Sequence, residues 1–209
     1  MIVPAVLTDK REEFVHMLSI CREFAKFVQI DVMDGKFVPS KSISPSDLGG
    51  LKSPLPCEAH VMADNPLDWI IPFKDFGAQR IIFHFEISMN KAEVIESIQA
   101  SGLKAGLAVN PDTKVEEFSY LVDKVDAILF MSVVPGFYGS PFVPAVLDKI
   151  KKFKRLYPHK ETGIDGGVKL DNLDKVKRTG VSYICVGSAI LKASSPQEAY
   201  NSFLTQNLQ

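Results

Sequence analysis

The segment Phe27-Val28-Gln29-Ile30-Asp31-Val32-Met33-Asp34-Gly35 is a largely apolar run that closes on acidic residues and a glycine. Such runs are typical of parallel strands covered on both faces of a sheet. The pattern recurs along the whole chain. We therefore expect eight strands, at residues 2–7, 27–32, 57–62, 80–85, 104–109, 127–132, 162–165 and 183–186.

Amphipathic segments separate these runs, and the clearest helices are expected at residues 11–24, 90–100, 143–156 and 196–204. Eight strand–helix units in 209 residues leave about 26 residues for each, near the lower size limit of an eight-fold barrel. We predict an α/β fold consisting of a single eight-stranded parallel (βα)8 TIM barrel over residues 1–209. A doubly wound open sheet is the competing architecture, since it has the same alternation. The number of units and the polar residues at strand ends favour the barrel.

Composition excludes several classes of protein. The formal net charge is −1, without the basic excess of a nucleic-acid-binding protein. No apolar run approaches the roughly 18–20 residues of a membrane span, and no signal peptide is recognisable at the start. Three widely spaced cysteines indicate neither a disulfide framework nor a zinc ribbon, so we expect a cytoplasmic protein. The basic run at residues 149–155 is interpreted as the solvated face of a helix.

In a βα barrel the carboxyl ends of all strands meet at one mouth, and three expected strands end near Asp31, His60 and Asp165. Two carboxylates facing one cavity form a natural acid–base pair for moving a proton next to a carbonyl. The three side chains also make a set that can hold a zinc-like or iron-like cation, which would stabilise an enolate. The simpler alternative is that His60 is a hydrogen-bonded core histidine. For Asp34 we favour a turn cap, and for His84 a core or orienting role.

Glycines follow three consecutive strands, where backbone N–H groups can approach an anion. The loops after the seventh and eighth strands are the usual phosphate site of this fold. The residues concerned are Gly136, Gly139, Gly166, Gly167, Gly187 and Ser188. Met33, Met62 and Met131 lie at the ends of three different strands and are either core residues or an apolar wall over a reactive intermediate.

At these positions the chain resembles the ribulose-phosphate 3-epimerase family of metal-dependent barrels. The matching segments are Asp31-Val32-Met33-Asp34-Gly35 with Phe37-Val38-Pro39, His60-Val61-Met62, Asn110-Pro111, Met131-Ser132-Val133 with Pro135-Gly136-Phe137, Asp165-Gly166-Gly167 and Gly187-Ser188-Ala189. The resemblance implies interconversion of ribulose 5-phosphate and xylulose 5-phosphate, in a homo-oligomer.

It also implies a role for each site residue. Asp31 and Asp165 are the acid–base pair and, with His60, ligands of a divalent Zn, Fe, Mn or Co ion. Three methionines would cap the enediolate. The phosphate and the rest of the substrate would lie against the glycines named above and Ser140.

The chain departs from the family pattern in three places. Gln29 stands at the position of a fourth metal ligand, a histidine, and would coordinate through its oxygen. Ala5 replaces a substrate-binding serine, and Tyr138-Gly139-Ser140 replaces a glycine-glycine-glutamine phosphate loop. We expect a phosphoketose 3-epimerase. A catalytically altered or inactive relative that binds a phosphosugar or a protein is the second hypothesis, and a metal-independent decarboxylase or aldolase is the third.

Overall fold

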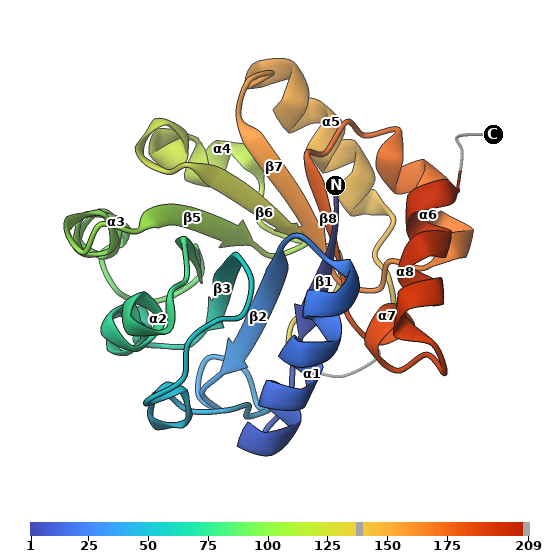
Figure 1. The fold of residues 1–209 in the computed structure, drawn as a ribbon. Coiled ribbons are helices and arrows are strands. Elements are labelled where there is room, and N and C mark those ends of the chain that lie inside the picture. The colour runs from blue at the N-terminus through green and yellow to red at the C-terminus, as the bar shows by residue number, and fades with distance from the viewer. Residues whose placement is uncertain (137–139, 207–209) are drawn as a thin grey trace.

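Eight parallel strands form the centre of the molecule in the computed structural model, which describes residues 1–136 and 140–206. They close into a barrel in chain order, each strand pairing with the next and β8 with β1. Figure 1 shows this arrangement. The strands are β1 Ile2–Val6, β2 Val28–Met33, β3 Cys57–Met62, β4 Arg80–His84, β5 Lys104–Val109, β6 Ala127–Met131, β7 Glu161–Asp165 and β8 Tyr183–Val186. The predicted barrel is confirmed, and the expected strand ends differ from the observed ones by at most one residue.

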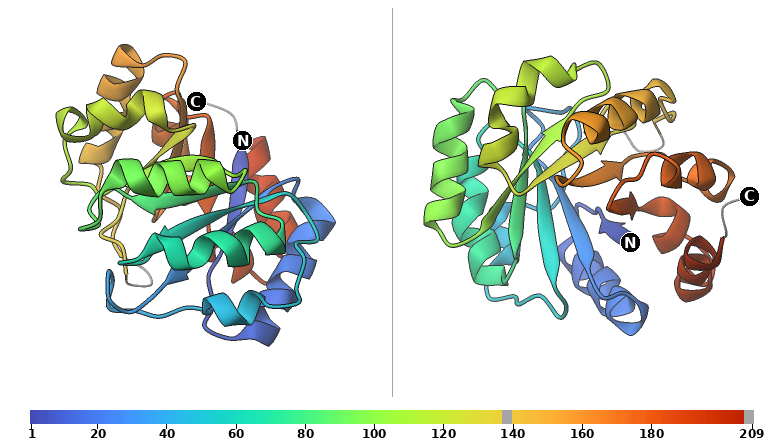
Figure 2. Two further views of the ribbon diagram at one scale, coloured as in Figure 1. Left: turned by 90° about the vertical axis from the view of Figure 1, so that its left-hand side faces the viewer. Right: turned by 90° about the horizontal axis from the view of Figure 1, so that it is seen from above.

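Helices surround the barrel on its outer side, as the two views of Figure 2 show. The longer helices are α1 Arg11–Phe24, α3 Lys91–Ala100, α5 Ala145–Leu156, α6 Leu170–Lys177 and α8 Pro196–Thr205. Shorter elements are α2 Ile70–Phe76, α4 Val115–Phe118 and α7 Ser188–Leu191, with 3-10 turns at η1 Pro45–Leu48, η2 Pro66–Trp69 and η3 Ser119–Lys124. Compact connections of this kind explain how eight units fit in so short a chain.

Alternate residues of each strand face opposite sides, because the side-chain period of a strand is two. One set packs outward against the helices: the Phe130 ring of β6, for example, lies 5.3 Å from the Phe153 ring of α5. The other set fills the barrel and includes Val3, Ile82 and Leu129, all fully buried. Gln29 and Asp31 belong to this inner set, which places both side chains inside the barrel.

The floor of the barrel, at the amino ends of the strands, is polar. Arg80 donates from Nε to Oε2 of the buried Glu58 at 2.7 Å, and its guanidinium also pairs with Glu161. The Tyr183 ring lies beneath Arg80, and Gly163 leaves the room it needs, since a Cβ there would stand 2.3 Å from the Tyr183 Cζ. Burial outweighs the attraction of Arg80 and raises the pKa of Glu58 to about 7.

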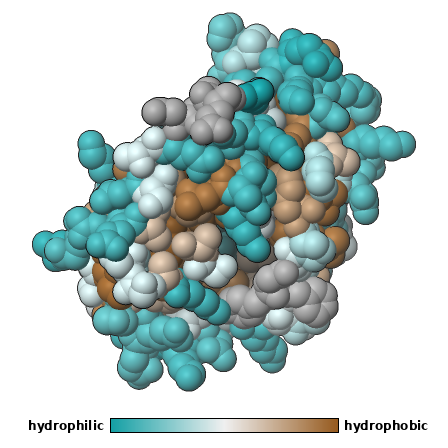
Figure 3. All heavy atoms as spheres, turned by 90° about the vertical axis from the view of Figure 1, so that its right-hand side faces the viewer, coloured by the Kyte–Doolittle hydropathy of each residue, from teal (hydrophilic) through white to brown (hydrophobic). Residues whose placement is uncertain are grey.

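The outer surface carries most of the charge. Figure 3 shows one face that is mostly hydrophilic, with apolar side chains exposed toward its middle. Lys149 is an exception to the solvated face expected at residues 149–155, because it is half-buried and its Nζ donates to the backbone oxygens of Asn110, Pro111 and Thr113. Among the described helices, none has both the length and the apolar character needed to cross a bilayer.

Candidate active site

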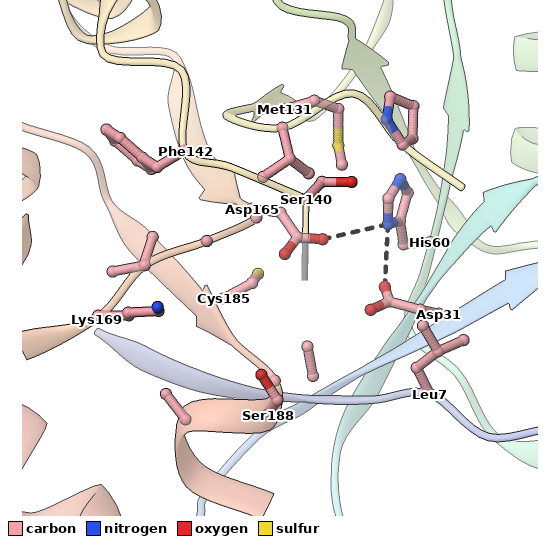
Figure 4. Close-up of a pocket in the computed structure, with 18 of the residues that line it drawn as sticks. Leu7, Asp31, His60, Met131, Ser140, Phe142, Asp165, Lys169, Cys185 and Ser188 are labelled. Atoms are coloured by element: carbon pink, nitrogen blue, oxygen red, sulfur yellow. Dashed lines mark hydrogen bonds and ion pairs between the residues drawn. The ribbon is translucent and has the colours of Figure 1, made fainter. Parts of the chain in front are cut away.

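Strands β2, β3 and β7 bring Asp31, His60 and Asp165 together at the mouth of the barrel. Asp31 pairs in register with His60, and Asp165 reaches the same point from the other flank. The His60 Nδ1 lies 3.0 Å from Oδ1 of Asp31 and 3.4 Å from Oδ2 of Asp165 (Figure 4). All three line a cavity of about 380 Å³, a size typical of small-ligand sites.

Burial and mutual contact perturb the ionisation of this cluster. Burial, followed by the negative charge of Asp165, raises the pKa of Asp31, while hydrogen bonds from His60 and Gln29 oppose the rise. Burial would lower the pKa of His60, but its contacts with Asp165 and Asp31 outweigh burial and raise that pKa to about 9. Perturbed groups that share a cavity are typical of a catalytic site.

A second histidine extends the cluster. The Nε2 atoms of His60 and His84 lie 2.9 Å apart, and Nδ1 of His84 lies 3.3 Å from Oε2 of Glu86. Burial lowers the pKa of His84, which keeps its ring neutral. A carboxylate can only accept, so His84 donates from Nδ1 to Glu86 and accepts at Nε2 from His60. His84 therefore orients His60, one of the roles expected for it.

Gln29 is fully buried beside the two carboxylates. Its Nε2 donates to Oδ1 of Asp31 and to Oδ2 of Asp165, both at 2.8 Å. Its Oε1 accepts a hydrogen bond from Sγ of Cys185 at 3.0 Å. The sequence suggested an oxygen ligand at Gln29 and assigned no site role to Cys185. Cys185 on β8 pairs in register with Asp165 on β7 and faces inward, and this position is the signal that could have indicated a site role for Cys185.

Three buried methionines cover the cavity from the ends of β2, β3 and β6. Met33, Met62 and Met131 are at most 5% exposed, and all three line the cavity. Met33 and Met62 pack against Val38 from the loop after β2. The structure thus places them as an apolar wall beside the aspartates.

The loop after β2 is ordered by its own side chains. Oδ1 of Asp34 accepts from the backbone N–H groups of Lys36 and Phe37, which confirms the expected turn cap. Ser40 donates to the backbone oxygen of Gly136, in the loop after β6. Gly136 has a φ of 101°, and a Cβ there would stand 2.7 Å from Cβ of Val38.

The glycines after β7 lie on the opposite side of the cavity. Gly166 and Gly167 have φ values of 109° and 64°, and no described residue accepts a hydrogen bond from their backbone N–H groups. Ser132 holds this turn by donating to the backbone oxygens of Asp165 and Gly166. Gly187, Ser188 and Ser140 also line the cavity, whereas Gly139 lies outside the described residues.

Residues 2–191 match the family model for the ribulose-phosphate 3 epimerase family. The chain belongs to this family. It is similar to the ribulose-phosphate 3-epimerase of Mycobacterium leprae, with 35% identity over 95% of this chain and 91% of the relative. It is 39% identical to the Escherichia coli K12 enzyme of that name, over 79% of this chain and 77% of the relative. The prediction of an isomerase is confirmed at the level of the family.

A solved structure supports the fold alone. Phosphoribosyl anthranilate isomerase of Thermococcus kodakaraensis aligns with a TM-score of 0.68 at 15% identity, over 99% of both chains. In this chain Asp31, His60 and Asp165 form a possible metal site, with one ligand atom from each lying within 4.8 Å of the others. All three are buried, and a carboxylate–imidazole set suits zinc, iron, manganese or cobalt, so these residues fit a divalent ion.

Proposed function

We propose that this chain is a phosphoketose 3-epimerase that interconverts ribulose 5-phosphate and xylulose 5-phosphate. The observation that carries the proposal is the placement of Asp31 and Asp165 on two flanks of one cavity, bridged by His60. Epimerisation needs a base on each face of the same carbon, because the proton leaves from one side and returns from the other.

The proton transfers balance between the two acids. One carboxylate removes the proton from carbon 3, the C–H electron pair forms the double bond to carbon 2, and the carbonyl oxygen becomes an enediolate oxygen. The other aspartic acid then gives its proton to the opposite face of carbon 3. After one turnover the two acids have exchanged protonation states, ready for the reverse reaction. The raised pKa of Asp31 favours it as the initial acid when Asp165 is the base.

Other cavity residues bind and shield the substrate in this proposal. Asp31, His60 and Asp165 would hold the divalent ion, which when bound supplies Lewis-acid stabilisation of negative charge. Met33, Met62 and Met131 would exclude water from the enediolate. The phosphate would accept hydrogen bonds from the turns at Gly166, Gly167, Gly187 and Ser188.

Solvent deuterium tests the mechanism directly. The wild-type protein, supplied in turn with zinc, iron, manganese or cobalt, should convert ribulose 5-phosphate to xylulose 5-phosphate and incorporate deuterium at carbon 3. Asp31→Asn and Asp165→Asn should each lose about 10²–10⁴-fold in epimerisation, because each lacks one general base. Each should still exchange the proton of one epimer, a different epimer for each variant.

Asp148→Asn is the matched control, since Asp148 is exposed on α5 and pairs there with Lys151. It should match the wild type. Absence of deuterium exchange from the folded wild-type protein with all four ions would refute the epimerase. Binding of the phosphosugar without turnover would instead identify an inactive relative. The homo-oligomer and the cytoplasmic location stay predictions.

A further inference from the structure

Two nitrogen atoms and two oxygen atoms alternate around a small ring at the centre of the site. Nε2 of Gln29 lies 2.8 Å from both Oδ1 of Asp31 and Oδ2 of Asp165. Nδ1 of His60 lies 3.0 Å and 3.4 Å from the same two oxygens. Gln29 thus contacts the same two carboxylate oxygens that lie nearest to Nδ1 of His60, the third residue of the possible metal site.

The orientation of the Gln29 amide follows from what its neighbours can donate. Asp165, the initial base of the proposed function, is a carboxylate that only accepts hydrogen bonds, so the side of the amide that faces it must be its NH2 group. The opposite side faces the Cys185 Sγ, whose thiol donates to Oε1 at 3.0 Å. Turning the amide over would place its oxygen 2.8 Å from Oδ2 of Asp165, and neither of these two acceptor atoms carries a hydrogen.

The contact between Gln29 and Cys185 crosses strand β1, because β1 pairs with β2 on one side and with β8 on the other. Ala5 pairs in register with Gln29, and its side chain is buried and has no polar atom. The thiol is therefore the group that satisfies the amide oxygen of Gln29. Since both side chains are almost completely buried, bulk water cannot take the place of either partner.

We propose that Gln29 is a positioning residue that joins the two carboxylates as a neutral hydrogen-bond donor, and that Cys185 fixes its orientation. An ion bound at Asp31, His60 and Asp165 must displace the Gln29 NH2 group from the oxygens it occupies. Gln29 therefore competes with the ion and does not ligate it. This inference rests on the metal site of the proposed function, but not on the two-base chemistry.

Two substitutions test the competition, and the readout is ion affinity measured by calorimetric titration of Mn²⁺ or Zn²⁺ into chelator-treated protein. Gln29→Leu should bind the ion about tenfold more tightly or better, equivalent to about 1.4 kcal/mol, because the competing donor is gone. Cys185→Ala should also bind more tightly, since the released amide can turn away. Cys185→Ser is the matched control: its hydroxyl can still donate to Oε1, so it should retain wild-type affinity.

The melting temperature of each metal-free protein gives a second readout. Gln29→Leu should melt several degrees lower in chelator, because two charge-assisted hydrogen bonds are lost. Weaker ion binding by Gln29→Leu would identify Gln29 as a ligand and overturn the inference, while the proposed function would stand. Ion binding by neither protein would overturn both the competition and the metal site. A Cys185→Ala affinity equal to that of the wild type would remove the role of the thiol.

Discussion

Replacing Glu86 by glutamine should change the proton arrangement of two histidines without touching the cavity aspartates. Oε1 of Glu86 accepts from the backbone N–H of Asn110 and from the Thr113 hydroxyl. In Glu86→Gln these two donors keep the amide oxygen on their side, so the amide NH2 faces Nδ1 of His84. His84 must then accept there and donate from Nε2, which forces His60 to carry its proton on Nδ1. The lone pair that His60 would offer an ion is lost.

The magnitude follows from the contact that is replaced. A hydrogen bond to a charged group contributes about 1.5–3 kcal/mol, and loss of a residue that orients a metal ligand commonly costs about 10–100-fold. The Glu86 side chain is 22% exposed, so solvent offsets part of the loss. We therefore expect both the ion affinity and kcat/KM to decrease roughly tenfold.

The assay is a calorimetric titration with Mn²⁺ beside steady-state epimerisation. Glu93→Gln is the control, because Glu93 is exposed and its side chain accepts a local hydrogen bond from Asn90 at the start of α3. A folded Glu86→Gln protein whose ion affinity and kcat/KM stay within about twofold of wild type would show that the proton positions assigned to the two histidines are wrong, because the expected decrease is larger.

Three further predictions concern the barrel floor. Gly163→Ala should destabilise the fold by about 1–3 kcal/mol in urea titration, because its Cβ would overlap the Tyr183 ring, and adding Tyr183→Leu should recover part of the loss. Arg80→Met should cost about 1–3 kcal/mol at neutral pH and lower the melting temperature, since the buried Glu58 takes up a proton and is left without its hydrogen-bond donor. The pKa of Glu58 is raised from 4.5 to about 7, so its stabilising contribution is complete below pH 4.5 and lost as the pH rises through 7. Urea titrations from pH 4.5 to 7.5 should show Glu58→Gln with a flatter stability profile than wild type.

The fold and the central cluster could be predicted because both depend on local periodicity. Apolar runs located every strand to within one residue, and the period of two placed Gln29 and Asp31 on the same inner side. The parallel order of the strands then brought Asp165 to the same mouth. These steps need no knowledge of contacts between particular side chains.

The finer features depend on contacts across the barrel, which sequence spacing does not reveal. The Gln29–Cys185 hydrogen bond joins residues 156 positions apart, and the direction of the Gln29 amide is set by three neighbours on three strands. Lys149 is similar: its place in a basic run indicated solvent, while the loop oxygens that accept from it lie beyond β5. Such details are decided by tertiary packing.

The polar floor of the barrel affects how long a deuteron taken from labelled substrate stays on the aspartate that removed it. Within the described part of the chain, Tyr183 and the Arg80–Glu58 pair fill the end of the barrel opposite the aspartates, which leaves the mouth as the route by which water reaches those acids. A bound sugar phosphate would stand in that route. A deuteron taken from labelled substrate should therefore remain on its aspartate longer than an exposed acid would keep it, and some of it should return to the carbon it came from.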